Sequence, residues 1–163
     1  MNLLLFSSEE CEGGVCTVRD ARAAHLRDVL RVAPGDRFQA GVVDGPIGVA
    51  TVTEMTEGEV RFTFAPEGEG PKPWYDLVLA LTRPRSLRRI LSQSATLGVR
   101  TLFLVGAEKV EKSYFNMHLL RPEEYRPLLL DGLMQGKATA LPRVRVVPRL
   151  RALWDELPEE GTR

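Results

Sequence analysis

The feature that most constrains the fold is a pair of short apolar runs separated by one amphipathic segment. Residues 77–81 (LVLAL) and 101–105 (TLFLV) are each typical of a strand buried on both faces of a parallel sheet. Between them, residues 85–97 place apolar side chains at helical spacing, and Gly98 is positioned to end that helix. A β–α–β unit of this length predicts two parallel strands joined by a right-handed crossover.

The same pattern continues toward the carboxyl terminus. Residues 122–133 predict a second helix, in which Glu123 and Glu124 lie near the positive end of the helix dipole. A further strand is expected at residues 144–147. We expect the parallel sheet to self-associate or to expose an apolar surface. The alternative is that the short amphipathic tail covers this surface by folding back through Leu150, Leu153, Trp154 and Leu157.

The first part of the chain follows a different pattern. Residues 37–43, 47–54 and 59–64 are short runs of β-branched and aromatic residues separated by glycine-containing turns. Such runs are typical of a small antiparallel barrel or sandwich. One helix is expected before them, within residues 19–31, because its apolar residues recur at near-helical spacing.

A boundary between the two patterns is visible at residues 66–73, where glycine, proline and charge replace apolar periodicity. We therefore expect one domain at residues 1–70 and a second at residues 71–163. A chain of 163 residues with 44% hydrophobic and 27% charged residues is long enough to bury a core in each of them.

Membrane and metal-binding classes are disfavoured. No apolar run approaches the roughly 18 residues that span a bilayer, and the opening residues lack a positive flank, so we expect a cytoplasmic protein without a membrane partner. The chain has 2 cysteines, Cys11 and Cys16, with no histidine nearby. We expect no metal site and interpret both cysteines as reduced thiols.

The charge is divided unevenly between the two parts. Residues 1–70 contain 6 Lys and Arg against 12 Asp and Glu, whereas residues 71–163 contain 16 against 10. Residues 136–154 carry five basic side chains and no acid. A polyanion such as RNA is therefore the expected partner of the second part, with a solvated charged surface as the alternative.

Several motifs make the interpretation more specific. Residues 25–36 (HLRDVLRVAPGD), followed by Asp44-Gly45, resemble the PUA-like amino-terminal domain of the bacterial 16S rRNA uridine-N3 methyltransferases, which belong to the SPOUT class. Four further blocks resemble, in order and spacing, the catalytic domain of that family: residues 79–85 (LALTRPR), 97–99 (LGV), 110–114 (VEKSY) and 133–142 (LMQGKATALP).

This resemblance implies a fold, a reaction and partners. The fold would be α/β plus all-β, with a small PUA-like barrel followed by part of a SPOUT trefoil-knot domain. The family transfers a methyl group from S-adenosylmethionine to 16S rRNA in the small ribosomal subunit, acts as a homodimer and uses no metal. The donor-binding Gly-Pro-Glu-Gly-Gly and Leu-Gly…Arg-Ile-Leu-Arg blocks of the family are absent from this sequence. We therefore expect no cofactor-binding residue in the chain as given, and a longer product carrying those blocks should bind the donor.

Nine residues are candidates for RNA binding, the arginines from their density and position along the chain and Lys112 from the resemblance. They are Arg27, Arg31, Arg83, Arg85, Arg88, Arg89, Lys112, Gln135 and Lys137. Guanidinium groups at the end of a strand and the start of a helix could bind phosphates bidentately, although they could equally form the solvated face of a helix. Ion pairing with Asp28 and Asp36 is the alternative for the first two arginines, and helix capping is the alternative for Gln135.

No catalytic residue is assigned, because Met134 stands where many members carry an acid. Three functions remain open at this point. The first is an rRNA methyltransferase or a truncated relative of one, and the second is a non-catalytic RNA-binding protein derived from that family. The third is an α/β interaction domain without a nucleic-acid partner.

Overall fold

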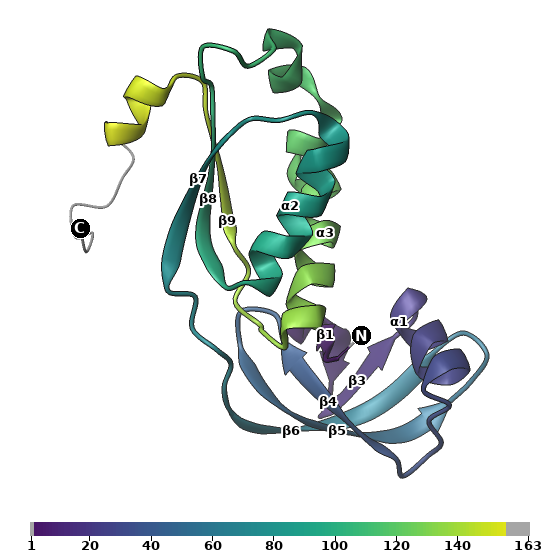
Figure 1. The fold of residues 1–163 in the computed structure, drawn as a ribbon. Coiled ribbons are helices and arrows are strands. Elements are labelled where there is room, and N and C mark those ends of the chain that lie inside the picture. The colour runs from purple at the N-terminus through teal and green to yellow at the C-terminus, as the bar shows by residue number, and fades with distance from the viewer. Residues whose placement is uncertain (1, 156–163) are drawn as a thin grey trace. The chain divides into compact units, whose positions relative to one another are not determined.

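Two separate sheets organise the chain, which has a mixed α/β fold (Figure 1). The computed structural model describes residues 2–155. The chain divides into a first unit, Met1–Lys72 with Leu133–Leu141, and a second unit, Pro73–Gly132 with Pro142–Arg163. The first unit therefore includes a segment that we expected to lie wholly in the second domain.

The first unit is built on a six-stranded sheet in the order β1-β4-β5-β6-β3-β2. Its strands are β1 (Leu4–Phe6), β2 (Cys11–Glu12), β3 (Val15–Val18), β4 (Arg37–Val42), β5 (Pro46–Met55) and β6 (Val60–Glu69). Neighbouring strands are antiparallel except β1, which pairs in parallel with β4. The three expected strands are confirmed as β4, β5 and β6.

The stretch at residues 66–73 is only partly a linker. Strand β6 runs through Pro66 to Glu69, and Glu69 pairs with Pro46 across the sheet. Gly48 makes this pairing possible, because a Cβ at that position would lie 2.1 Å from the main-chain oxygen of Ala65. The strand thus extends to within three residues of the boundary at Lys72.

A short helical segment connects β3 to β4, as the spacing predicted. Helix α1 (Ala21–Ala24) is capped by Asp20, whose carboxylate accepts a hydrogen bond of 2.8 Å from the main-chain N–H of Arg22. It continues as a π-helical turn, η2 (His25–Val29). Leu26 is fully buried, whereas Val29 and Leu30 are exposed.

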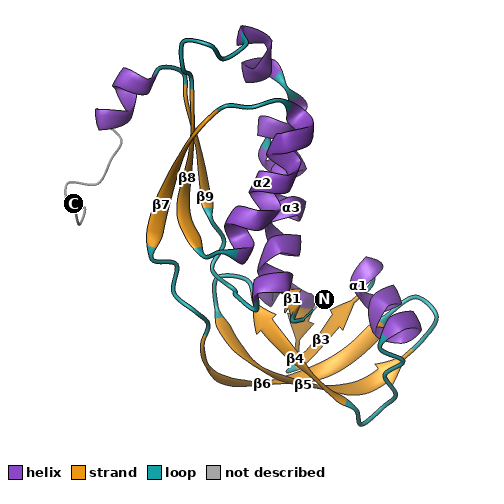
Figure 2. Cartoon of the chain, in the orientation of Figure 1, coloured by secondary structure: helices purple, strands orange, loops and turns teal. Residues whose placement is uncertain are grey.

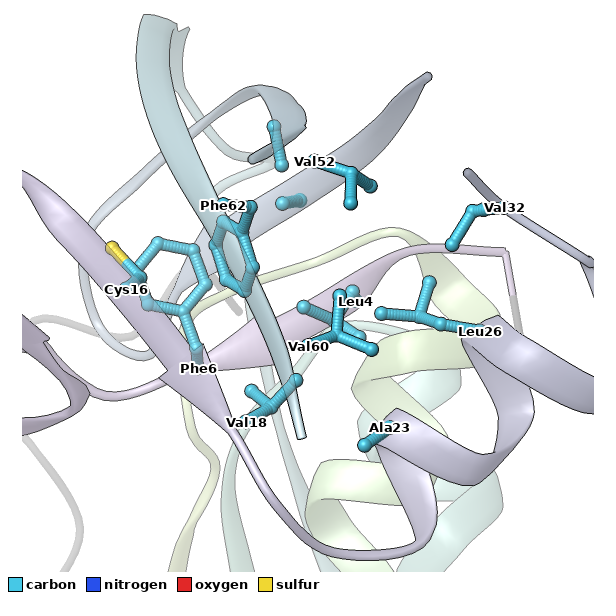
Figure 3. Close-up of a cluster of buried hydrophobic side chains, with 12 residues drawn as sticks. Leu4, Phe6, Cys16, Val18, Ala23, Leu26, Val32, Val52, Val60 and Phe62 are labelled. Atoms are coloured by element: carbon cyan, nitrogen blue, oxygen red, sulfur yellow. The ribbon is translucent and has the colours of Figure 1, made fainter. Parts of the chain in front are cut away.

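The hydrophobic core of the first unit lies between its sheet and this helical segment (Figure 3). Phe6 and Phe62 pack edge to face with ring centroids 5.3 Å apart, and Phe38 contacts Phe62 in the same manner. Leu26 and Val60 belong to the same buried cluster. Burial of these side chains holds the helical segment against the sheet.

The interpretation of the two cysteines as free thiols was wrong. Cys11 and Cys16 face each other as an antiparallel pair on β2 and β3, and their sulfur atoms form a disulfide. The turn at Gly13 and Gly14, which both have positive φ, brings these strands together. The sequence did not indicate the disulfide, because the pairing of Cys11 with Cys16 depends on the register of two strands. A separation of five residues does not specify that register.

The second unit contains the parallel sheet that the apolar runs predicted. Strands β7 (Tyr75–Ala80), β8 (Val99–Val105) and β9 (Arg143–Val147) pair in parallel in that order. Helices α2 (Pro84–Thr96) and α3 (Pro122–Gly136) lie along one face of this sheet (Figure 2). Gly98 has a φ of +78° and ends α2 as expected.

The two long helices pack closely at one point. A Cβ on Gly132 of α3 would lie 2.0 Å from the main-chain oxygen of Ser92 in α2, so only glycine fits there. The hydroxyl of Thr96 donates to the oxygen of Gly132 at 3.0 Å. Three short 3-10 segments complete the unit, namely η3 (Lys112–Asn116), η4 (His118–Leu120) and η5 (Leu150–Asp155).

Burial differs between the two predicted core strands. Residues 102–105 of β8 are buried on both faces, as expected. The expectation was wrong for β7, where Val78 and Ala80 are exposed. They alternate with the half-buried Leu77 and Leu79, so one face of this strand is uncovered, and β7 also has a paired strand on one side only among residues 2–155. Leu153 of η5 packs with Phe103 and buries part of the face opposite the helices. Leu157, which we expected to assist it, lies outside the described residues.

Candidate nucleic-acid interface

The carboxyl ends of the three parallel strands remain tied together beyond the sheet. The N–H of Leu81 donates to the oxygen of Val105 at 2.8 Å, and the N–H of Gly106 donates to that of Val147 at 2.9 Å. Leu150 N–H then donates to the oxygen of Gly106 at 3.0 Å. The loops after β7 and β8 therefore start from a fixed common edge, which is where open α/β sheets bind ligands.

Gly106 is essential to this arrangement. A Cβ at this position would lie 2.0 Å from the oxygen of Pro148 and 3.0 Å from the ring of Phe115. The close approach requires glycine on steric grounds rather than for an unusual φ. It fixes the direction in which the loop at residues 107–111 leaves β8.

A cavity of about 530 Å³ opens at this edge. Its apolar wall comes from the end of β7, from Ile90 of α2 and from the loop after β8. Tyr114 supplies an aromatic ring, and Arg83 and Lys109 supply positive charge. The complete lining is Leu79, Ala80, Leu81, Thr82, Arg83, Ile90, Ala107, Lys109, Val110 and Tyr114.

Arg83 occupies the position before the first residue of α2, and its side chain is exposed. Its Nε donates to the hydroxyl of Ser86 at 3.3 Å, which leaves the outer guanidinium nitrogens available. Arg85, Arg88 and Arg89 follow on the first turns of the helix and are exposed as well. Within the described part of the chain, these three make no ion pair. Cations in the first turn of a helix are mildly unfavourable, so the position of Arg85 favours a ligand-binding role, whereas Arg88 and Arg89 lie in the second turn.

Lys112 begins η3 and is exposed on the same loop as the cavity. The neighbouring carboxylate of Glu111 accepts a hydrogen bond of 2.7 Å from the hydroxyl of Ser113. No ion pair joins Glu111 to Lys112 within residues 2–155, so the ammonium group of Lys112 is available to a ligand. Lys109, which the motifs did not single out, lines the cavity directly.

Gln135 and Lys137 belong to the first unit, whereas Arg83 and Lys112 belong to the second. Both side chains are exposed, and Lys137 has a φ of +54° just after α3 ends. The main-chain oxygen of Gln135 accepts a hydrogen bond of 3.0 Å from the side-chain amide of Asn2. Ala138 N–H donates to the oxygen of Leu133 at 3.1 Å and closes the helix end. The side-chain amide of Gln135 is therefore not required as the cap.

Arg27 and Arg31 lie at the end of the first helical segment and differ in their pairing. Arg27 binds Asp28 bidentately, with Nε–Oδ1 and Nη2–Oδ2 distances of 2.7 and 2.9 Å, and also donates to the oxygen of Glu57. The hydrogen bond from Arg27 lowers the pKa of the exposed Asp28 carboxyl. Arg31 has a φ of +53°, is exposed and makes no ion pair among residues 2–155.

A second hollow, of about 730 Å³, lies in the first unit beside the disulfide hairpin. Its cations are already neutralised. Arg22 binds Glu10 and Asp20, and Arg19 and Arg61 both bind Glu59. Because Glu9 and Glu12 add further negative charge to the lining, this hollow is unsuited to a polyanion.

Long apolar helices and clusters of metal-ligating side chains are both absent from residues 2–155. No helix among them combines the length and apolar character needed to cross a membrane. Over the same residues, His, Cys, Asp and Glu side chains do not gather in a group that could hold a metal ion.

Comparison with known proteins identifies relatives along the whole chain. A family described as the RNA methyltransferase domain matches residues 69–163. Ribosomal RNA small subunit methyltransferase E of Treponema pallidum is 35% identical over 161 residues, which is 96% of this chain and 60% of that protein. Ribosomal RNA small subunit methyltransferase E 1 of Borreliella burgdorferi is 28% identical and is covered to 68% of its length, against 99% of this chain.

Solved structures share the fold at lower identity. A probable rRNA methyltransferase from Porphyromonas gingivalis superposes with a TM-score of 0.74 at 18% identity, over 97% of this chain and 65% of that one. Ribosomal RNA small subunit methyltransferase E from Neisseria gonorrhoeae, bound to S-adenosyl methionine, gives a TM-score of 0.72 at 18% identity, over 98% and 66%. The chain thus spans about 60–68% of the length of these four relatives.

Proposed function

Because the chain belongs to the RNA methyltransferase family, we propose that it takes part in the methylation of 16S ribosomal RNA and that its described residues recognise the RNA. The observation that carries this proposal is the cavity at the carboxyl edge of the parallel sheet. Its rim holds Arg83 and Lys109, it lies in the residues that match the family, and Arg85 follows directly. Guanidinium and ammonium groups around an apolar cavity suit a ligand that combines phosphates with bases.

The two units divide this task. We propose that the first unit is a PUA-like barrel that docks on the RNA through Arg27, Arg31, Gln135 and Lys137. The second unit is the first part of a SPOUT domain and binds RNA through Arg83, Arg85, Arg88, Arg89 and Lys112. A ribosomal RNA partner implies a cytoplasmic location. Within residues 2–155, β7 has a paired strand on one side only and Val78 is exposed, which supports assembly into a homodimer through the second unit.

The methyl donor of the family does not fit the described residues. The relative from Neisseria gonorrhoeae binds S-adenosyl methionine, and in the resemblance noted above the donor is held by glycine-rich main chain. Among the described glycines of the second unit, Gly106 and Gly132 leave no space for a ligand against their main chain. A main-chain oxygen lies 2.0 Å from the position that a Cβ would take at each of them. Gly98 ends a helix and forms no loop around a ligand. We therefore propose RNA binding as the role of these residues and derive no step of the methyl transfer through the donor.

The same glycine geometry favours a second candidate function, that of a non-catalytic RNA-binding protein from this family. Both functions require RNA binding and differ in methyl transfer. Incubation of the chain with 16S rRNA and tritiated S-adenosylmethionine separates them, because only an active enzyme places label in the RNA.

RNA recognition is tested by filter binding of 16S rRNA helices over a range of salt concentrations. Loss of each phosphate contact lowers the slope of log affinity against log salt by about 0.7–0.9. We expect the double variant Arg83→Gln/Arg85→Gln to lower that slope by about 1.4–1.8.

Arg100→Gln is the matched control, since Arg100 lies at the opposite end of the seven-residue strand β8 and pairs with Asp76 at 2.7 Å. That end is roughly 20 Å from the cavity, given a rise of about 3.3 Å per strand residue. Equal slopes for both variants, or no salt dependence in the unaltered chain, would reject the proposal.

A further inference from the structure

We infer that Cys11 is a site of covalent modification, at which small, positively charged thiols exchange with the Cys11–Cys16 disulfide. This chemistry goes beyond the proposed function and does not depend on it. The disulfide joins β2 to β3 at one end of the six-stranded sheet. The two sulfur atoms differ in access, β2 is attached to the sheet by few contacts, and the surroundings of Cys11 are acidic.

Access to the two sulfur atoms is unequal. A thiolate attacks a disulfide sulfur from the side opposite the bond that breaks. Because the disulfide spans two strands, attack on Cys16 would have to come from β6, where Phe62 pairs directly with Cys16 and is fully buried. Attack on Cys11 comes from the outer side of β2, which is the end strand of the sheet within residues 2–155.

Burial distinguishes the two cysteines in the same way. Cys16 is 4% exposed and belongs to the core cluster drawn in Figure 3. Cys11 is half-buried and lines the hollow of about 730 Å³ beside the hairpin. Thiol–disulfide exchange depends on which sulfur can be reached. Cys11 is therefore the residue to which an external thiol becomes attached.

The exchange consists of two balanced steps. The sulfur of an external thiol, RS–H, bonds to Cys11 as the bond to Cys16 breaks, and Cys16 takes the proton. A second molecule of the thiol then attacks the external sulfur, which releases Cys11 as a thiol together with the disulfide RS–SR. Two external thiols are thus oxidised as the protein disulfide is reduced. In the reverse direction RS–SR is the oxidant, and RS is again attached to Cys11 first.

Breaking the disulfide leaves the base of the hairpin in place. Strand β2 contains two residues, and these make its only two pairs with β3. The base is anchored separately through Glu10, whose carboxylate accepts a hydrogen bond of 2.8 Å from the N–H of Ser7 and pairs with Arg22. Arg22 also donates to the main-chain oxygen of Leu5 at 2.6 Å. The modification therefore frees β2 without removing the contacts that hold the chain on either side of it.

The charge around Cys11 selects the kind of thiol. The three arginines that line the hollow are already paired with acids, as described above. Glu9 and Glu12 lie close to Cys11 in the sequence, line the same hollow and are exposed. Neither makes an ion pair in the part of the chain that the structure describes. Their negative charge attracts a positively charged thiol to Cys11 and repels an anionic one.

Two single variants of the full chain test which cysteine reacts. Cys16→Ala leaves Cys11 as the only thiol of the chain, and Cys11→Ala leaves Cys16. Each is treated with cystamine, the disulfide of a positively charged thiol, and intact-protein mass spectrometry follows the mixed disulfide. We expect Cys11 to react at least about ten-fold faster than Cys16, because a buried thiol reacts only through local opening. The two rates should become equal in urea, and equal rates in the folded variants would overturn the inference.

The unaltered chain gives the same test without a substitution. After brief exposure to cysteamine and acid quenching, fragmentation of the peptide that contains both cysteines locates the attached thiol. We expect it on Cys11. Attachment to Cys16, or a disulfide that survives excess cysteamine in the folded chain, would overturn the site.

A second thiol tests the role of charge. 2-Mercaptoethanesulfonate has the same two-carbon chain as cysteamine but a negative charge. Glu9→Gln/Glu12→Gln should lower the ratio of the cysteamine rate to the 2-mercaptoethanesulfonate rate about two- to five-fold at low salt, and less at high salt. Glu67→Gln/Glu108→Gln is the control, since both side chains are exposed and neither lines the hollow. An equal change in both double variants would overturn the selection of positively charged thiols.

Discussion

Thr139 donates its hydroxyl proton to the main-chain oxygen of Gly45 at 2.7 Å, across 94 residues of sequence. The contact is one of several that hold the segment after α3 in the first unit. The oxygen of Thr139 accepts from the N–H of Asp44 at 2.9 Å, and the carboxylate of Asp44 accepts from the N–H of Leu141 at 2.7 Å. A Cβ on Gly41 would lie 2.6 Å from the methyl group of Thr139, so the Thr139 side chain packs directly against the main chain of Gly41.

Thr139→Val should destabilise the protein. The side chain is 3% exposed, and the substitution keeps its shape but leaves the oxygen of Gly45 without this donor. We expect a loss of about 1–3 kcal/mol in the free energy of unfolding, measured by urea denaturation. Thr139→Ser retains the hydroxyl and should recover much of the loss. Equal stability of the Val variant and the unaltered chain would show that the hydrogen bond contributes nothing.

Gly106→Ala should disturb the candidate site as well as the fold. Its Cβ would meet the oxygen of Pro148 at 2.0 Å, so β8 or the following loop must shift. Such overpacking costs about 1–3 kcal/mol, and RNA affinity should fall with it. Gly58→Ala is the control, because no atom lies within 4 Å of a Cβ there. A Gly106→Ala variant that is as stable as the Gly58→Ala variant contradicts the steric argument.

Reduction of the Cys11–Cys16 disulfide should lower stability by about 2 kcal/mol, the value expected for so short a closed loop. The measurement compares urea denaturation with and without a phosphine reductant. In the double variant Cys11→Ser/Cys16→Ser, the reductant should have no effect. Identical unfolding curves for the oxidised and reduced unaltered chain would indicate that the bridge adds nothing to the hairpin.

The contribution of Asp20 should depend on pH in a defined direction. The side-chain hydrogen bond from Arg22 lowers the pKa of the Asp20 carboxyl in the folded protein. A lowered folded pKa gives stability that is present above the unfolded value, about 4, and is lost as pH falls through the folded value. Asp20→Asn keeps the helix cap and removes the charge.

The stability difference between the unaltered chain and Asp20→Asn should therefore be constant near neutrality and shrink below about pH 4. We expect it to be no more than about 1 kcal/mol, since the carboxylate is largely exposed. Thermal unfolding between pH 7 and the acid limit of the fold measures it. If the stability difference between the two proteins grew as the pH fell, the pKa of Asp20 would be raised on folding rather than lowered, and the prediction would be wrong.

The chain as given should not bind S-adenosylmethionine, because its described glycines provide no cradle for the donor. Isothermal titration calorimetry at donor concentrations up to the millimolar range measures this directly, with a full-length methyltransferase E as the positive control. Stoichiometric heat with this chain would mean that residues we have not recognised assemble a donor site.

The elements with strong local patterns were predictable, and those defined by distant contacts were not. Strand β8 and helix α2 were visible because continuous apolar residues and the stop at Gly98 specify them locally. Strand β1 escaped prediction because its pairing with β4 is parallel and distant in sequence. Membership of residues 133–141 in the first unit depends on contacts such as Thr139 to Gly45, for which no local signal exists.

The candidate site shows the same division. The arginines at the start of α2 were predicted from their density, which the sequence displays directly. Thr82 and Lys109 carry no distinguishing pattern, and only the meeting of two loops at the sheet edge makes them neighbours of one cavity. The position of β7 at a sheet edge likewise depended on strand order, which its apolar composition does not specify.

The placement of residues 133–141 in the first unit also sets an order on biosynthesis. The strands of that unit leave the ribosome long before Thr139 is made, so their glycines at positions 41 and 70 stay uncovered in the nascent chain. At about 5–20 residues per second, the 67 residues between Lys72 and Thr139 take roughly 3–13 s to synthesise. During that interval the growing chain carries an incomplete first unit, and its final closure waits for translation of α3.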